Sequence, residues 1–253
     1  IAIIKAGSSI FHLNGMEEGE FPALPPLSGG KQIKVSQNTL KELLFQTSFA
    51  ISRDDNRYVL MGMLLQIEEQ TAIFVGTDGK RLSKTHTAVN VDADFSGQYI
   101  IPLKAIEEMQ KNLENSEEEL ATLYLLEDKV ALEASHTLIV SKLLNGAYPD
   151  FNQVIPTSSE VSVSLHREEL STLLRQIILF TADSNSSTRF TFTDGQLTLT
   201  ANTLEIGTGR VSMPVDYHGE QMDIAFNPHY FLDILRHTKD ETVSLDLTDS
   251  FNP

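Results

Sequence analysis

The sequence contains no cysteine among its 253 residues. This absence excludes disulfide bonds, catalysis by a thiolate and zinc sites with cysteine ligands. It also suits a reducing compartment, so we expect a cytoplasmic protein.

Long hydrophobic runs are missing as well. The densest apolar run, residues 58–65, is far shorter than the roughly 18 residues that a membrane-spanning helix needs. It predicts a buried strand, and we expect no membrane partner. The first residues carry no basic segment of the kind that opens a signal peptide. The chain begins without methionine in a strand-like pattern and stops within another domain at Asn252 and Pro253, so we interpret it as a fragment.

Positive charge is scarce in this sequence. Only 19 Lys and Arg stand against 35 Asp and Glu, which gives a formal net charge of −16. Acidic clusters at residues 17–20 and 117–119 are typical of a solvated surface. Tight binding to DNA needs many cations that neutralise phosphates, and this charge balance argues against it.

The motifs of common enzyme and metal sites are also absent. The sequence holds no glycine-rich phosphate loop, no His-Glu-x-x-His and no Gly-x-Ser-x-Gly. His229 and His237 share one predicted helix but lie eight residues apart, with no acidic partner at liganding spacing. Adjacent carboxylates such as Glu107 and Glu108 point in different directions from a helix. We therefore expect no catalytic residues, no cofactor and no metal.

What the sequence does contain is an approximate internal repeat. Residues 40–44 (LKELL) and 170–174 (LSTLL) each open a helical pattern, and each is followed by strand-rich sequence with a tight-turn signal such as Asp-Gly. A second helix follows in each copy, at residues 102–113 and 227–238, and then an alternating strand. A repeat of roughly 125 residues is too long for a solenoid unit and indicates two duplicated helix-and-sheet domains.

Local signals predict where the elements of these copies lie. Residues 1–13 predict two short strands around a glycine turn. Ser36 is a candidate N-cap for a helix over residues 37–52, and residues 58–67 predict a strand. In the second copy, residues 165–181 predict the first helix.

Several segments in a fixed order resemble one protein family. They are residues 57–63 (RYVLMGM), 77–82 (TDGKRL), 141–143 (SKL), 148–151 (YPDF), 154–156 (VIP) and, near the end, 247–250 (LTDS). Together they resemble the bacterial β sliding clamp, the processivity subunit of the replicative DNA polymerase III, over essentially the whole chain. This resemblance implies a non-enzymatic protein of DNA replication that encircles duplex DNA. It also implies docking of the polymerase and the clamp loader through short linear peptides.

The resemblance implies an architecture. The family has three similar domains per protomer, each with two helices packed on antiparallel β-sheets, and two protomers close head-to-tail into a ring. We therefore expect an α+β fold. Residues 1–30 would be a remnant of the first domain with its linker, 31–157 the middle domain, and 158–253 a third domain that lacks its C-terminal end. We expect a full-length form to be a homodimer and this chain to be monomeric.

The resemblance also assigns site residues. The partner-peptide pocket between the middle and third domains would comprise Leu60, Thr77, Gly79, Lys80, Arg81, Leu82, Pro149 and Val154. The DNA channel, which both helices of each domain face, would present Lys41, Arg53, Lys104, Lys111, Arg175, Arg236 and Lys239. The dimer interface would include Leu179 and Phe180. In the pocket, apolar anchors would supply the affinity while Arg81 orients the main chain of the peptide.

A ring also offers an explanation of the acidic composition. It holds DNA by topology, so a few cations on the channel helices suffice while the outside stays acidic. We expect residues 117–119 to lie away from the channel face. The chain departs from the family at Gln153, where some members carry a basic residue, and in the absent C-terminal end, which supplies a wall of the pocket. Two alternatives are a hydrolase with a site in the groove between domains and a peptide-binding module without DNA contact.

Overall fold

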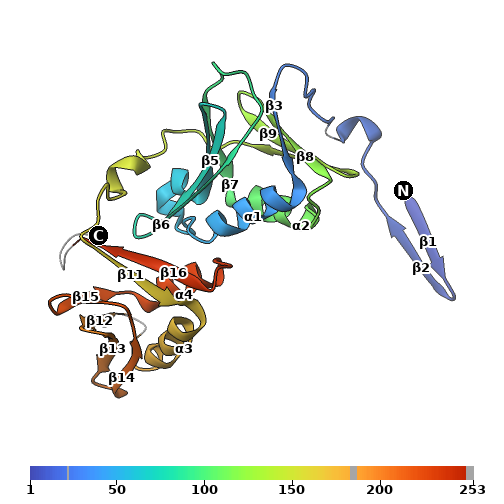
Figure 1. The fold of residues 1–253 in the computed structure, drawn as a ribbon. Helices are drawn as coiled ribbons and strands as arrows, with labels where there is room; N and C mark the ends of the chain where they lie inside the picture. The colour runs from blue at the N-terminus through green and yellow to red at the C-terminus, as the bar shows by residue number, and fades with distance from the viewer. Residues whose placement is uncertain (22, 183–186, 249–253) are drawn as a thin grey trace.

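The computed structural model describes residues 1–21, 23–182 and 187–248; Asp249 and Ser250 of the last motif lie outside the described residues. Two units of helices and sheets follow one another along the chain, after a short hairpin (Figure 1). The hairpin consists of β1 (Ala2–Ala6) and β2 (Ser9–Leu13), paired antiparallel as predicted, and its side chains are exposed. Within the described part of the chain, no helix is both long and apolar enough to cross a membrane.

The first unit contains two antiparallel sheets and two helices. Its elements are β3 (Lys31–Ser36), α1 (Gln37–Ser48), the 3-10 helix η2 (Asp55–Met61), β4 (Gly62–Glu68), β5 (Thr71–Thr77), β6 (Leu82–Ala88), β7 (Gly97–Pro102), α2 (Leu103–Asn112), β8 (Leu120–Leu125), β9 (Lys129–Ala134) and β10 (Thr137–Lys142). One sheet has the strand order β10-β9-β8-β3 and the other β6-β5-β4-β7. Both helices lie on one side of these sheets (Figure 1).

The second unit repeats this order of elements. They are β11 (Val161–His166), α3 (Arg167–Ile178), β12 (Thr188–Thr193), β13 (Gln196–Thr203), β14 (Gly207–Pro214), β15 (Met222–Phe226), α4 (Pro228–Arg236) and β16 (Thr242–Leu247). The sheet β14-β13-β12-β15 corresponds to β6-β5-β4-β7, and β11 pairs with β16 as β3 pairs with β8. Counterparts of β9 and β10 do not occur among the described residues of this unit. The predicted α+β class with duplicated antiparallel units is confirmed.

Helices α1, α3 and α4 begin where a polar side chain caps the first turn, whereas α2 begins after Pro102 without such a cap. Ser36 accepts a hydrogen bond from the amide three residues on (3.2 Å), and Asn227 at the start of α4 accepts one from the amide two residues on (3.0 Å). The helix predicted over residues 37–52 ends earlier, at Ser48, because the next amides bond carbonyls three residues back. The helix predicted over residues 165–181 is also shorter, because its first residues pair with β16 as part of β11.

The start of one strand differs from the prediction. Residues 58–61, expected to open a strand, instead belong to η2, and β4 begins only at Gly62. The carboxylate of Asp54 accepts a hydrogen bond from the Asn56 amide (3.0 Å) and starts this turn. Such a local side-chain bond competes with strand pairing. The consequence is that Leu60 leaves the sheet and is placed beside the linker between the units.

Three apolar clusters hold the fold together. One fills each unit, and a third joins β4, β5 and β7 to the linker after β10. Helix α2 packs on α1, and α3 packs on α4. His237, just after α4, stacks on the rings of Phe45 and Phe49 at the end of α1, with centroids 4.3 and 4.5 Å apart. The helices therefore form one row in the order α2-α1-α4-α3 (Figure 1).

Candidate functional site

All eight predicted pocket residues line a single cavity of about 410 Å³. They come from three places in the first unit and its linker: Leu60 in η2, the turn between β5 and β6, and the segment after β10. Asp150 and Phe151 complete the lining. The size and mixed lining are typical of a cavity that accepts a small ligand or a few side chains.

The floor of this cavity is apolar and well packed. Leu60 and Phe151 are 7% and 5% exposed and belong to the third cluster together with Tyr148. The Tyr148 hydroxyl donates to the Val75 carbonyl (3.4 Å). Burial raises the pKa of this hydroxyl to about 12, so it stays neutral at physiological pH. The floor therefore offers apolar contact without charge.

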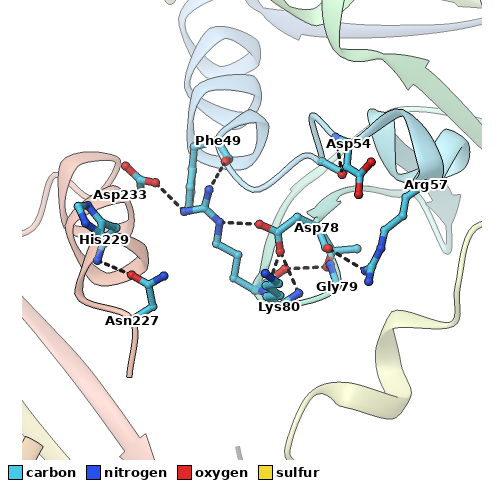
Figure 2. A network of polar contacts seen from close by, with 12 residues as sticks. Phe49, Asp54, Arg57, Asp78, Gly79, Lys80, Asn227, His229 and Asp233 are labelled. Carbon is cyan, nitrogen blue, oxygen red and sulfur yellow. Dashed lines mark hydrogen bonds and ion pairs between the residues drawn. The ribbon is translucent and has the colours of Figure 1, made fainter. Parts of the chain in front are cut away.

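The turn between β5 and β6 forms one rim and is held by its own side chains (Figure 2). Asp78 Oδ1 accepts hydrogen bonds from the amides of Lys80 (2.9 Å) and Arg81 (3.0 Å). Thr77 Oγ1 accepts from the Gly79 amide (3.0 Å) and donates to the Arg81 carbonyl (2.6 Å). These bonds explain why the Thr-Asp-Gly sequence forms a tight turn here.

Glycine is required at one position of this turn. Gly79 has a φ of +81°, and a Cβ placed there would overlap the guanidinium of Arg57. That guanidinium donates to the Asp78 carbonyl (2.9 Å) and so closes the turn from outside (Figure 2). The family segment RYVLMGM thus contributes Arg57 to the support of the rim.

The linker after β10 forms the opposite rim. Asp150 caps the 3-10 helix η3 (Phe151–Val154), because its Oδ1 accepts from the amide two residues on (3.1 Å). Its Oδ2 accepts from the side-chain amide of Gln153 (3.1 Å). Pro149 is exposed, and Val154 is 62% exposed. Apolar groups of the rim are thus accessible to a ligand.

The guanidinium of Arg81 bonds to three groups of the chain itself, which belong to the labelled residues Asp78, Asp233 and Phe49 in Figure 2. Its Nε donates to Asp78 Oδ2 (3.2 Å), Nη1 to Asp233 Oδ2 (2.6 Å), and Nη2 to the Phe49 carbonyl (3.0 Å). The ring of Tyr230 lies 4.7 Å from the guanidinium carbon. These partners differ from the predicted one, which is the main chain of a peptide, and that role of Arg81 stays a prediction.

The seven predicted channel cations lie on or just after the helices. Five have polar partners: Lys41 donates to Asn115 (2.9 Å), Arg53 pairs with Glu107 (3.5 Å), Lys111 with Glu108 (2.8 Å), Arg236 with Asp233 (3.6 Å), and Lys239 with Glu42. Lys104 and Arg175 are exposed and form no ion pair with any described residue. Lys41, Lys111 and Lys239 also line a second cavity, of about 860 Å³, along α1 and α2.

Glu117, in the acidic segment 117–119, contacts the start of α1. Glu117 accepts hydrogen bonds from Ser36 Oγ (2.6 Å) and Asn38 Nδ2 (2.5 Å) at the start of α1. These bonds, with a smaller contribution from Lys239, lower the pKa of Glu117. Helix α1 has no acidic residue in its first turn, so this loop supplies a carboxylate to its positive end. Residue 117 therefore lies at the start of α1, and the expectation that residues 117–119 lie away from the channel face stays a prediction.

The two predicted interface residues have different surroundings. Leu179 is 69% exposed at the end of α3. Phe180 is half-buried and packs on the core of its own unit, against Gly209 of β14. Because β14 is the outer strand of its sheet, Leu179 and this edge lie on an accessible side of the unit. Their role in a dimer stays a prediction.

Several residues of the site were not singled out from the sequence. Asp150 and Phe151 line the cavity, and the YPDF segment that contains them was the available signal. Asp233 and Tyr230 reach Arg81 from α4, and Asp233 is 152 positions away from it in the sequence. No local pattern indicates such a contact. Among the described residues, no group of three or more His, Cys, Asp or Glu is placed to hold a metal ion.

Comparison with known proteins shows the family of this chain. The profile described as DNA polymerase III beta subunit, central domain, matches residues 34–150, and the profile of its C-terminal domain matches residues 152–253. The chain belongs to the DNA polymerase III beta subunit family. The beta sliding clamp of Chlamydia pneumoniae is 52% identical over all 253 residues, which span 69% of that protein.

More distant sliding clamps share the fold. The beta sliding clamp of Bacillus subtilis is 28% identical over the whole chain, which spans 68% of that protein. A crystal structure of the DNA polymerase sliding clamp from Pseudomonas aeruginosa with ligand has a TM-score of 0.91 at 28% identity, covering 99% of this chain and 68% of that one. About a third of each relative therefore lies outside the matched part.

Membership of this family confirms the sliding-clamp function predicted from the sequence. The family is a processivity factor of DNA replication and not an enzyme, which favours the clamp over a hydrolase. Sliding clamps encircle DNA and serve polymerases, so DNA and a polymerase are the partners that the family implies. This also favours the clamp over a peptide-binding module without DNA contact.

Proposed function

We propose that the complete protein closes as a ring around duplex DNA and tethers the replicative polymerase and the clamp loader through the cavity described above. Residues 31–157 and 158–253 are its middle and third domains, and residues 1–30 are a remnant of the first domain with its linker. The observation that carries the proposal is the convergence of the β5–β6 turn and the linker on one apolar cavity. A cytoplasmic location is part of the same proposal.

The charges of the chain support holding DNA by topology. The net charge is −16, and most of the seven channel cations already have partners within the chain. Direct affinity for a short linear duplex should therefore be weak and steeply dependent on salt. A full-length form should stay on circular DNA and slide off after linearisation. Tight, salt-resistant binding to a short linear duplex would contradict this mechanism.

The cavity suits a short extended peptide that carries a Gln and a terminal Leu-Phe pair. Its floor would bury the two apolar side chains, while backbone groups of the rim bond the main chain. The test is calorimetric titration of such a peptide into the wild-type chain and Pro149→Asp. The new carboxylate would lose water without gaining a partner when the peptide binds, so we expect a loss of roughly 10-fold or more.

The linker provides a matched control for this titration. Asn152→Asp introduces the same charge three residues further along, on an exposed side chain outside the cavity. It should leave the affinity within about twofold of wild type, since exposed charges are well solvated. Equal affinity of wild type and Pro149→Asp would remove the cavity from the proposal.

A full-length form should assemble head-to-tail as a homodimer through the end of α3, whereas this chain should be monomeric in dilute solution. Leu179→Asp is the cleaner test of that interface, because Leu179 is mostly exposed in the free chain. Phe180→Asp should also weaken the dimer, but it disturbs packing within its own unit. Sedimentation of full-length Leu179→Asp should show dissociation, and cooperative thermal unfolding should show that the dissociated protomer is still folded. A stable closed dimer of this chain would overturn the assembly proposal.

A further inference from the structure

Arg81 connects the two units at the edge of the peptide cavity. Its guanidinium bonds Asp78 in the cavity-lining turn, the Phe49 carbonyl after α1 and Asp233 on α4 (Figure 2). Tyr230, one turn earlier on α4, lies against the same guanidinium. The guanidinium is a rigid planar fork, so bonds in three directions fix these elements relative to one another.

Asp233 takes part in this connection without lining the cavity. Its Oδ2 bonds Arg81 at 2.6 Å, and its Oδ1 lies 3.6 Å from Arg236. The residue after Arg81 is Leu82, whose side chain lines the cavity, and the Arg81 carbonyl accepts the Thr77 hydroxyl bond. The position of Arg81 therefore fixes both ends of the rim turn.

We propose that Asp233 is a positioning residue for the peptide pocket, which it controls through Arg81. By tying the turn to α4, it holds the rim in the conformation that a peptide binds. The inference rests on the proposed function of this pocket. Without the Asp233 carboxylate, the mostly buried guanidinium keeps Asp78 as its one charged partner among the described residues, and only the ring of Tyr230 still holds it to α4.

This arrangement couples pocket occupancy to the spacing of the two units. If the contact with α4 favours the binding conformation of the rim, a bound peptide favours the contact by the same factor, because coupling free energies are reciprocal. Peptide binding should therefore narrow the range of spacings between the units. Loss of the Asp233 carboxylate should broaden it.

A second ion pair between the two units provides the control. Lys239, after α4, bonds Glu42 on α1, and His237 stacks on Phe45 and Phe49 nearby. The Lys239–Glu42 pair ties the segment after α4 to α1 without touching the turn between β5 and β6. Glu42→Gln therefore weakens the boundary between the units but leaves the bonds of the rim intact.

The first experiment is titration of the peptide with a Gln and a terminal Leu-Phe pair into four proteins: wild type, Asp233→Asn, Asp233→Glu and Glu42→Gln. We expect Asp233→Asn to weaken binding about 3- to 30-fold, Asp233→Glu to recover most of this loss, and Glu42→Gln to stay within about twofold of wild type. Thermal unfolding of each variant checks that it is folded. A purely structural role would lower stability without this pattern of affinities.

Each outcome of the titration decides one point. Equal affinity of wild type and Asp233→Asn would overturn the positioning role and leave the pocket in place. An equal loss in Asp233→Asn and Glu42→Gln would also overturn it, because the effect would then belong to the boundary as a whole. Absence of binding to the wild type would overturn the proposed pocket, and the positioning role with it.

A distance measurement tests the coupling directly. The chain has no cysteine, so Glu127→Cys in the turn after β8 and Glu205→Cys in the turn after β13 can carry one spin label on each unit. Saturating peptide should narrow the distribution of label distances in the otherwise wild-type chain. Without peptide, Asp233→Asn should show a broader distribution. Identical distributions in the two proteins would contradict the coupling.

Discussion

The hairpin between β5 and β6 and the hairpin between β13 and β14 occupy the same position in the two units, yet their side chains behave differently. In each, the earlier strand ends in a threonine, Thr77 or Thr203, which pairs with the first residue of the next strand. Thr77 Oγ1 makes two hydrogen bonds within its turn. Thr203 Oγ1 is buried without a partner in the described part of the chain, and Leu204 beside it is fully exposed.

The strand order determines where each hairpin lies, whereas the neighbouring elements determine which contacts its side chains make. The repeated strand order places both hairpins at the same edge of a sheet. In the first unit the linker and α4 lie beside the hairpin, so Asp78, Arg81 and Leu82 find partners or line a cavity. The turn at residues 204–206 has no such neighbour among the described residues. Duplication thus supplied two equivalent positions, and among the described residues only the turn between β5 and β6 lines the cavity that we propose for a peptide.

The largest expected effect contrasts one leucine from each hairpin. Leu82→Asp should weaken binding of the Leu-Phe peptide by roughly 30-fold or more, because a carboxylate in the apolar cavity loses water without gaining a partner. Leu204→Asp makes the same change on an exposed side chain and should leave the affinity unchanged. Calorimetry measures both, and thermal unfolding checks the fold. Comparable losses in the two variants would show that the effect is not local to the cavity.

A smaller effect contrasts the two threonines. Thr77→Val removes two hydrogen bonds from the turn and should cost about 1–2 kcal/mol of unfolding free energy. Thr203→Val removes a buried hydroxyl that has no partner, so it should be neutral or stabilise by up to about 1 kcal/mol. Urea unfolding monitored by circular dichroism gives both values. A greater loss for Thr203→Val would mean that this hydroxyl is bonded, for example to water, and that the two turns are more alike than their contacts indicate.

Much of the fold could be predicted because it is encoded locally. The Ser36 cap, the Asp78-Gly79 turn and the alternating strands each depend on neighbours in the sequence. Residues 58–61 were misassigned because their apolar pattern fits a strand, whereas the Asp54 carboxylate starts a 3-10 turn. A pattern of apolar residues cannot distinguish a strand from a 3-10 turn here, because Leu60 is buried in either conformation.

The pocket was predicted by resemblance, and its supports were not predicted at all. Leu60 and Pro149 are far apart in the sequence, and nothing in their local patterns brings them to one cavity. The bond from Arg81 to Asp233 depends on how the two units are placed, which no helical or strand periodicity contains. Contacts between the two units are therefore the part of the structure that the sequence patterns did not predict.

The N-termini of α1 and α3 offer a second contrast between the units. Helix α3 carries Glu168 and Glu169 in its own first turn, where a carboxylate stabilises the positive end of the helix. Helix α1 has no acidic residue there, and Glu117 reaches it from the loop before β8. A carboxylate at the start of the first helix therefore comes from the helix itself in the second unit and from a distant loop in the first unit.

The smallest expected effect tests that distant carboxylate. Since folding lowers the pKa of Glu117, its charge stabilises the folded state above the ordinary glutamate pKa, and this contribution is lost as the pH falls through the lowered pKa. Glu117→Gln should therefore unfold about one to two degrees below wild type near pH 7, and the gap should close once the pH has fallen below the lowered pKa of Glu117.

Glu118→Gln is the matched control for this pH series. Glu118 is exposed and has no hydrogen bond to any described residue, so its variant should show no gap that depends on pH. Thermal unfolding of the three proteins across the acid range gives the comparison. Protonated Glu and Gln are both neutral, so a gap that persists in acid would assign the effect to lost hydrogen-bond geometry. Only a difference in unfolding temperature that disappears in acid assigns the effect to the negative charge of Glu117 at the start of α1.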